Sequence, residues 1–187
     1  MVAEILQYFA DGIRIRNIEA DAIYAGIMVD TDNFLQKTGV RTFEAAAFLR
    51  RCGADVTRVR KLFREDMNDY RARGETIRNA ELFRNACAIS ECPADYVDSP
   101  TVVGAQAANE LLNIIGVKAT FVLTDYKGTI YVSARAIDEV NVQIIMERMG
   151  GGGHLNIAGC QLEGYSVSRA KNYLKEVLTE MLDGGEL

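Results

Sequence analysis

The sequence predicts an α/β protein in two parts: a mainly helical part over residues 1–76 and a mixed β-sheet with packed helices over residues 77–187. Apolar residues of the first part recur at helical spacings. In the second part, two apolar runs at 119–124 and 129–134 are joined by the short polar turn Asp125–Gly128, which predicts a β-hairpin. Helical patterns at 101–112, 137–149 and 168–182 surround these strands, and further strands are expected at 86–90 and 158–162.

The helical part divides at capping residues and glycines. Apolar spacing predicts helices over 2–10 and from residue 17 to about 27. The short apolar run Ile27–Asp30, which ends in an acid, is expected to be a buried strand or the segment leaving one. Thr42 is a plausible N-cap for a helix that ends at Gly53, and Asp55 or Thr57 caps the next one. The polar stretch 71–75 marks the expected boundary between the two parts.

Composition excludes several functions. Of the 187 residues, 49% are hydrophobic and 25% charged, which is typical of a folded globular protein. A net charge of −5 argues against a broad face for duplex DNA, because such a face needs excess Lys and Arg. The four cysteines form no CxxC pair, and no apolar run reaches the ~18 residues of a membrane span. These features predict a cytoplasmic protein with reduced thiols.

The run Gly150–Gly153 followed by His154 is the strongest chemical feature. Consecutive glycines allow backbone N–H groups to approach an anion closely, and a histidine can donate a hydrogen bond to a phosphate oxygen. Two residues apart on a predicted strand, Ser133 and Arg135 would share one face, where a hydroxyl and a planar guanidinium suit a phosphate. Asn141 opens the helix before the glycines. The structural alternatives are a tight turn for the glycines, a surface salt bridge for Arg135 and a helix cap for Asn141.

Together these residues resemble a known family. The elements that carry the resemblance are Ser133-Ala134-Arg135, Asn141-Val142-Gln143, Gly150 to His154, and Ala158-Gly159. They are similar to the DHHA1 domain, and the Asn-Val-Gln element and the glycines resemble the GGDEF/PAS-linked cyclic-di-AMP phosphodiesterases most. Upstream, residues 19–34 and 38–46 are similar to the end of the DHH catalytic domain. The resemblance therefore implies that residues 1–76 are a DHH remnant and that residues 77–187 are a DHHA1 substrate-binding domain.

The resemblance implies the C-terminal part of a hydrolase that converts cyclic-di-AMP to linear pApA with two Mn²⁺ ions. Asp30 matches one metal ligand of that family, and Ser133, Arg135, Asn141, Gly151, Gly152, Gly153 and His154 match its substrate-binding positions. The other metal ligands, including Asp-His-His, have no counterpart here, so we expect this chain alone to be inactive.

The alternatives are a nucleotide- or single-stranded RNA-binding module, an oligoribonuclease or pAp-phosphatase fragment, and a domain whose glycine turn is structural. The sequence does not distinguish a cyclic from a linear dinucleotide, or either from a short oligonucleotide. We expect a homodimer, because helical faces without their natural partners would expose apolar surface. The longer protein could be attached to the cell membrane by a region upstream of this chain.

Overall fold

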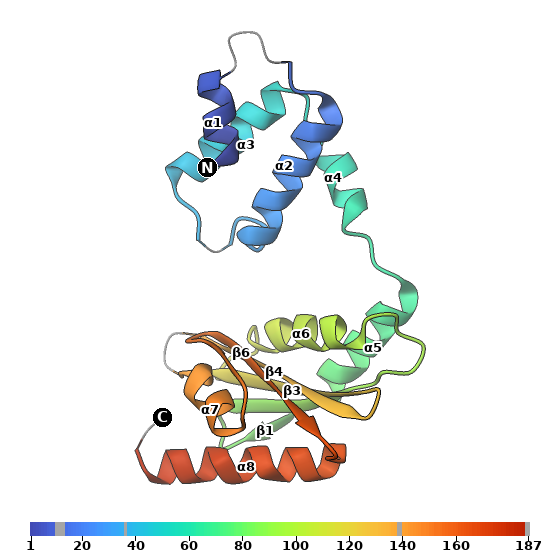
Figure 1. The fold of residues 1–187 in the computed structure, drawn as a ribbon, viewed down its shortest axis with the longest axis vertical. Helices are drawn as coiled ribbons and strands as arrows, with labels where there is room; N and C mark the ends of the chain where they lie inside the picture. Colours follow the sequence, from blue (N-terminus) through green and yellow to red (C-terminus); the bar gives the residue numbers. More distant parts are fainter. Residues whose placement is uncertain (10–13, 36, 138–139, 186–187) are drawn as a thin grey trace. The chain divides into compact units, whose positions relative to one another are not determined.

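The computed structural model describes residues 1–9, 14–35, 37–137 and 140–185. The chain forms two compact units, Met1–Arg64 and Glu65–Leu187, which are considered separately below (Figure 1). In the described part of the chain, no helix is long and apolar enough to cross a membrane.

The first unit consists of the helices α1 (Val2–Phe9), α2 (Asn17–Asp30), α3 (Val40–Arg51) and α4 (Val56–Leu62). Its small core contains the fully buried side chains of Ala20, Leu49 and Val59. The strand expected at residues 27–30 is wrong, because these residues form the last turn of α2. Helical hydrogen bonding continues to Thr31, whose backbone N–H and hydroxyl both donate to the carbonyl of Ile27 at 3.1 and 2.6 Å.

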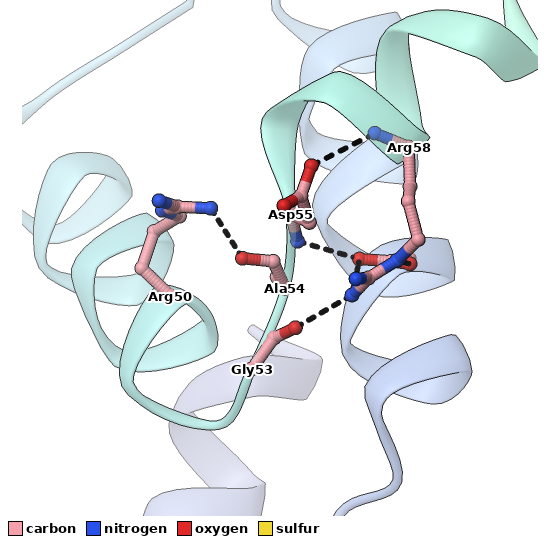
Figure 2. A network of polar contacts seen from close by, with 6 residues as sticks. Arg50, Gly53, Ala54, Asp55 and Arg58 are labelled. Atoms are coloured by element: carbon pink, nitrogen blue, oxygen red, sulfur yellow. Dashed lines mark hydrogen bonds and ion pairs between the residues drawn. The ribbon is translucent and has the colours of Figure 1, made fainter.

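A polar network joins α2 to the connection between α3 and α4 (Figure 2). Asp21 on α2 is buried, and its carboxylate accepts hydrogen bonds from the Arg58 guanidinium at 2.6 and 3.2 Å and from the Asp55 backbone at 2.7 Å. Arg58 also donates to the Gly53 carbonyl at 2.8 Å, and Asp55 caps α4 as expected. The hydrogen bond from Arg58 is the main reason that the pKa of Asp21 lies below its usual value.

The second unit is a six-stranded mixed sheet with helices on both faces. Its elements are α5 (Met67–Arg78), β1 (Glu81–Phe83), β2 (Cys87–Cys92), α6 (Pro100–Leu111), β3 (Ala119–Tyr126), β4 (Thr129–Ala136), α7 (Val142–Arg148), β5 (Gly152–His154), β6 (Ile157–Glu163) and α8 (Val167–Asp183). The order across the sheet is β1-β2-β3-β4-β6-β5, and only the β2–β3 pair is parallel among these strands. The predicted α/β class is therefore confirmed.

Alternation along the strands assigns each side chain to one of two faces. On one face, Phe121 and Val132 pack in the larger core with residues of α7 and α8, such as Met146 and Leu178. On the other face, Val122 packs with residues of α5 and α6. Figure 1 shows α5 and α6 along one side of the sheet and α8 along the other. The hairpin expected between β3 and β4 turns at Lys127 and Gly128, both with positive φ, which is the conformation of a tight two-residue hairpin turn.

The compact units divide after Arg64, before the boundary at residue 76 that the polar stretch 71–75 suggested. That stretch lies inside α5, which belongs to the second unit. The buried guanidinium of Arg73 fixes the stretch 71–75 in the second unit, because it pairs with Glu65 at 2.6 Å and with Glu110 at 2.9 Å. It also donates to Gln106 on α6 at 3.0 Å. A polar sequence can therefore belong to a helix interface when one buried arginine is satisfied by several partners.

Candidate functional site

The glycine run begins directly after α7 and continues into the outer strand of the sheet. Gly150 and Gly151 form the turn after α7, while Gly152, Gly153 and His154 form β5, which is antiparallel to β6. β5 is the last strand in the order, so half of its backbone hydrogen-bonding groups point away from the sheet. The run is thus partly a strand edge and not only a loop.

Three of the four glycines have a reason inside the fold. Gly150 has a φ of +81°, a conformation that side chains rarely adopt. A Cβ at Gly151 would lie 2.2 Å from the carbonyl oxygen of Gly159, and one at Gly153 would lie 2.5 Å from the Cα of Ala158. Gly152 differs from all of these, because a Cβ there would meet nothing within 4 Å and its φ does not lie in the positive region. The fold alone does not explain why this position lacks a side chain.

Strand register brings the separate motifs together on one face. Arg135 on β4 pairs with Ile157 on β6, which pairs with His154 on β5. In the next row, Ser133 pairs with Gly159, which pairs with Gly152. Because directly paired residues point to the same side of a sheet, these six residues form two neighbouring rows on one face. We call these rows the phosphate face, after the ligand that the sequence predicts for Ser133, Arg135 and His154.

This face is the one that α6 partly covers. Thr120, which pairs with Arg135, donates its hydroxyl hydrogen bond to the carbonyl of Ala108 on α6 at 2.8 Å. Beyond β4 the surface is open: Ile157 is 52% exposed, and His154 is exposed as well. The phosphate face is therefore a solvent-accessible part of the sheet beside α6.

Arg135 is held in place by neighbours on two elements. Its Nε donates to the side-chain oxygen of Asn109 on α6 at 2.8 Å, and one terminal nitrogen donates to the carbonyl of Ala134 at 2.9 Å. Burial lowers the pKa of Arg135 from its usual value. A guanidinium has five N–H donors, so this arrangement fixes its position and leaves donors for an anion. Among the described residues, no carboxylate forms the surface salt bridge considered for Arg135.

Asn109 is the residue that the sequence did not identify. Its place in a predicted helix could be read from the sequence, but its contact with a strand 26 residues away depends on how α6 packs. Its contact with Arg135 orients that side chain and places Asn109, which is exposed, at the border of the phosphate face.

Asn141 acts as the N-cap of α7, the structural role considered for it. Its side-chain oxygen accepts a hydrogen bond from the Gln143 backbone at 3.0 Å. The next residue, Val142, donates its backbone N–H to the carbonyl of Leu155 at 3.0 Å. Asn141 thus lies at the turn that follows His154, with its side-chain oxygen used by the cap. A direct contact of its amide with a ligand stays a prediction.

The Asn156 side chain offers a further polar group at this turn. Its oxygen is buried and has no hydrogen-bond partner among the described residues. Its backbone carbonyl accepts from Ala136 at 3.0 Å, which ties the turn to the end of β4. The turn after β5 therefore contains an acceptor that the described protein does not use.

The predicted metal ligand Asp30 belongs to the first unit, whereas the residues of the phosphate face belong to the second. It is the exposed last residue of α2, and Asp32 follows in a turn with a φ of +46°. Among the described residues, no group of three or more His, Cys, Asp or Glu side chains could hold a metal ion. Two Mn²⁺ ions need several such ligands, so the described residues do not fit a dinuclear centre.

Known proteins are similar to this chain over its whole length. It is 43% identical to the cyclic-di-AMP phosphodiesterase GdpP of Bacillus subtilis, with 99% of this chain and 28% of that protein covered. It is 41% identical to the GdpP of Geobacillus thermodenitrificans, covering 100% of this chain and 28% of that protein. The chain thus spans about a quarter of the length of these relatives.

A solved structure supports the fold. The exopolyphosphatase-related protein from Bacteroides fragilis matches 89% of this chain and 51% of its own with a TM-score of 0.78, at 21% identity. Residues 95–182 match the DHHA1 domain, which includes β3 to β6, α6 and α7 and therefore the phosphate face. Residues 95–182 of this chain therefore belong to the DHHA1 domain family, and the whole chain is similar to part of the cyclic-di-AMP phosphodiesterases.

Proposed function

We propose that this chain is the substrate-binding part of a manganese-dependent phosphodiesterase that hydrolyses cyclic-di-AMP to linear pApA. The observation that supports this most is the phosphate face, where a fixed arginine, a serine and an exposed histidine surround Gly152, a glycine with open space at its Cβ position. The similarity to cyclic-di-AMP phosphodiesterases gives the substrate class, since several relatives have that activity in their names.

In this proposal the residues bind and orient the substrate. The remaining N–H donors of Arg135 take one phosphate oxygen pair in a bidentate contact. Ser133 and His154 donate to other oxygens of the same phosphate or of the next one. Gly152 lets the sugar-phosphate backbone lie against β5 without a side chain in the way.

The hydrolysis itself would take place on groups outside the phosphate face. Water adds to one phosphorus, one P–O bond breaks, and the leaving oxygen takes the proton, so that pApA carries a new terminal phosphate. Metal ions in the longer protein would supply the activated water. Asp30 would be one ligand of that centre, whose other ligands are not among the described residues.

The binding part of the proposal can be tested on the purified chain. Arg135→Ala should weaken cyclic-di-AMP binding about 10- to 150-fold, the range for a hydrogen bond to a charged group. Arg71→Ala is a matched control, because Arg71 is exposed on α5. Equal affinity of the wild type and Arg135→Ala for cyclic-di-AMP would contradict the proposal. Manganese-dependent hydrolysis by this chain alone would contradict its assignment as a binding part.

Single-stranded RNA is the alternative ligand, and charge argues against it. The second unit has eleven Lys and Arg against eighteen Asp and Glu. Binding of RNA should therefore be weak and should fall steeply with salt, whereas a dinucleotide in one small site depends on few phosphate contacts. RNA binding tighter than cyclic-di-AMP binding in the same buffer would favour the alternative.

We also propose a homodimer, formed through apolar surface of the first unit. Tyr8 is 89% exposed, Phe9 69% and Val40 75%, on helices α1 and α3. Exposed apolar surface of this kind favours self-association. Light scattering at tens of micromolar should give the mass of two chains, and a monomer would contradict this. We also propose that the chain is cytoplasmic and that the longer protein is attached to the cell membrane.

A further inference from the structure

We propose that Tyr131 and Gln161 form a nucleobase-binding subsite beside the phosphate face. The proposal deepens the function proposed above and depends on it. It assigns to this chain the recognition of a base, in addition to the binding of phosphate.

The subsite is the next row of the same sheet face. Tyr131 on β4 pairs with Gln161 on β6, and both are two residues along their strands from the pair Ser133–Gly159. Two residues of a strand cover about 6.7 Å, and adjacent strands lie about 4.8 Å apart. A base on this row and a phosphate on the phosphate face would thus be separated by roughly the reach of one nucleotide.

The row between that of Arg135 and that of Tyr131 has no side chains on β5 and β6. Gly159 and Gly152 are paired neighbours and have no side chains above the backbone. Gly159 lacks one partly because a Cβ would lie 2.8 Å from the carbonyl oxygen of Val132, whereas space above Gly152 is open. The side chains of the neighbouring rows are larger: Arg135 and His154 lie in one row, and Tyr131 and Gln161 lie in the other. In this proposal the sugar lies over the two glycines between them.

Tyr131 has the chemistry and exposure of a stacking residue. On its strand, the residues that point to the opposite face, such as Ile130 and Val132, are buried in the core, while Tyr131 is only half-buried. Its ring lies 6.5 Å from that of Tyr126, at an angle of 54°, which limits its rotation without covering it by a parallel ring. An aromatic ring so placed can accept the face of a base.

Gln161 gives the subsite its polar edge. Its side chain is exposed on β6, directly across from Tyr131. An amide has both donor and acceptor groups, which is what the edge of a purine requires. A hydrophobic side chain at this position would have allowed stacking but no recognition. The pair therefore fits a purine base better than a bare phosphate or a sugar phosphate.

The test compares two probes on six forms of the full 187-residue chain. The probes are pApA and the same dinucleotide backbone without its bases, and the chains are the wild type, Tyr131→Ala, Tyr131→Phe, Gln161→Ala, Arg135→Ala and the control Tyr96→Ala. Stacking on one aromatic ring contributes about a 5- to 150-fold change in affinity. Tyr131→Ala should weaken pApA binding by a factor in this range and leave the abasic probe unchanged, while Tyr131→Phe should bind both probes as the wild type does. Gln161→Ala should also weaken pApA binding but not abasic binding.

Arg135→Ala separates this inference from the proposed function. It should weaken both probes, because it removes the phosphate contact. If Arg135→Ala has that effect and Tyr131→Ala does not change pApA binding, the base subsite is wrong and the proposed function stands. If the wild type binds neither probe, both are wrong. Tyr96→Ala is the matched control, since Tyr96 is 92% exposed, and thermal melting of Tyr131→Ala checks that its loss of binding is not a loss of folding.

Discussion

Adding one methyl group at Gly152 should separate binding from folding. Gly152→Ala places a Cβ where no protein atom lies within 4 Å, at a residue that is not in the positive-φ region. The neighbouring Gly151→Ala would place the same methyl group 2.2 Å from the Gly159 carbonyl oxygen and 2.4 Å from the Cβ of Cys160. The two variants therefore differ in one respect: the second clashes with the protein and the first only with a ligand.

The expected magnitudes follow from these contacts. An overpacked methyl group costs about 1–3 kcal/mol, so Gly151→Ala should melt roughly 2–12 °C below the wild type. Gly152→Ala should melt at the wild-type temperature or slightly above it, because alanine restricts the unfolded chain. If a dinucleotide approaches β5, the methyl group at Gly152 obstructs it. The affinity should then fall by about ten-fold or more, which corresponds to about 1.4 kcal/mol.

Calorimetric titration with cyclic-di-AMP and thermal melting provide the two measurements. Wild-type affinity in Gly152→Ala would show that no ligand approaches this strand, and the phosphate face would lose its main support. A large loss of thermal stability in Gly152→Ala would refute the reasoning in another way. It would mean that the open space above this glycine is closed in solution.

Three further outcomes follow from contacts outside the glycine run. Arg73→Ala should lower the free energy of unfolding by about 1–3 kcal/mol, measured by urea titration, because two carboxylates lose their partner. The hydrogen bond from Arg73 is also the main reason that the pKa of Glu65 lies below its ordinary value of 4.5. The stabilisation from this pair is therefore present above about pH 4.5 and is lost as the pH falls further. Below that pH, the free energy of unfolding of Arg73→Ala should change less with pH than that of the wild type. Asp21→Asn should destabilise the first unit through the loss of its charged contact with Arg58, and leave nucleotide affinity unchanged. Asp30→Ala should not alter Mn²⁺ binding by this chain, which calorimetry should find weak in both forms.

Local patterns predicted much of the sheet unit. The β3–β4 hairpin follows from two apolar runs around a glycine-containing turn, and its register is then set by the turn itself. Alternation placed Ser133 and Arg135 on one face, as observed. The run at 27–30 misled because three apolar residues followed by an acid suit a strand and the last turn of a helix equally well. Its length alone could not decide between them.

The candidate site required information that no local pattern contains. The motifs of Arg135 and His154 are separated in sequence, and only the insertion of β6 between β4 and β5 brings them to one row. The glycines were expected to act alike, yet each has a different environment. Gly150 has a positive φ, and a Cβ at Gly151 or Gly153 would meet atoms of the neighbouring strand β6, whereas Gly152 has neither constraint.

The positions of these residues argue for a division of labour in the longer protein. The phosphate face is built on one rigid sheet, with Arg135 fixed by Asn109 and by its own backbone. Such a surface can hold a dinucleotide without moving, which lowers the entropy that binding must overcome. It has no cluster of carboxylates, among the described residues, that would repel a phosphate or hold a metal near it. A surface with these properties is suited to binding and positioning a ligand rather than to activating water, which is the role that we propose for it.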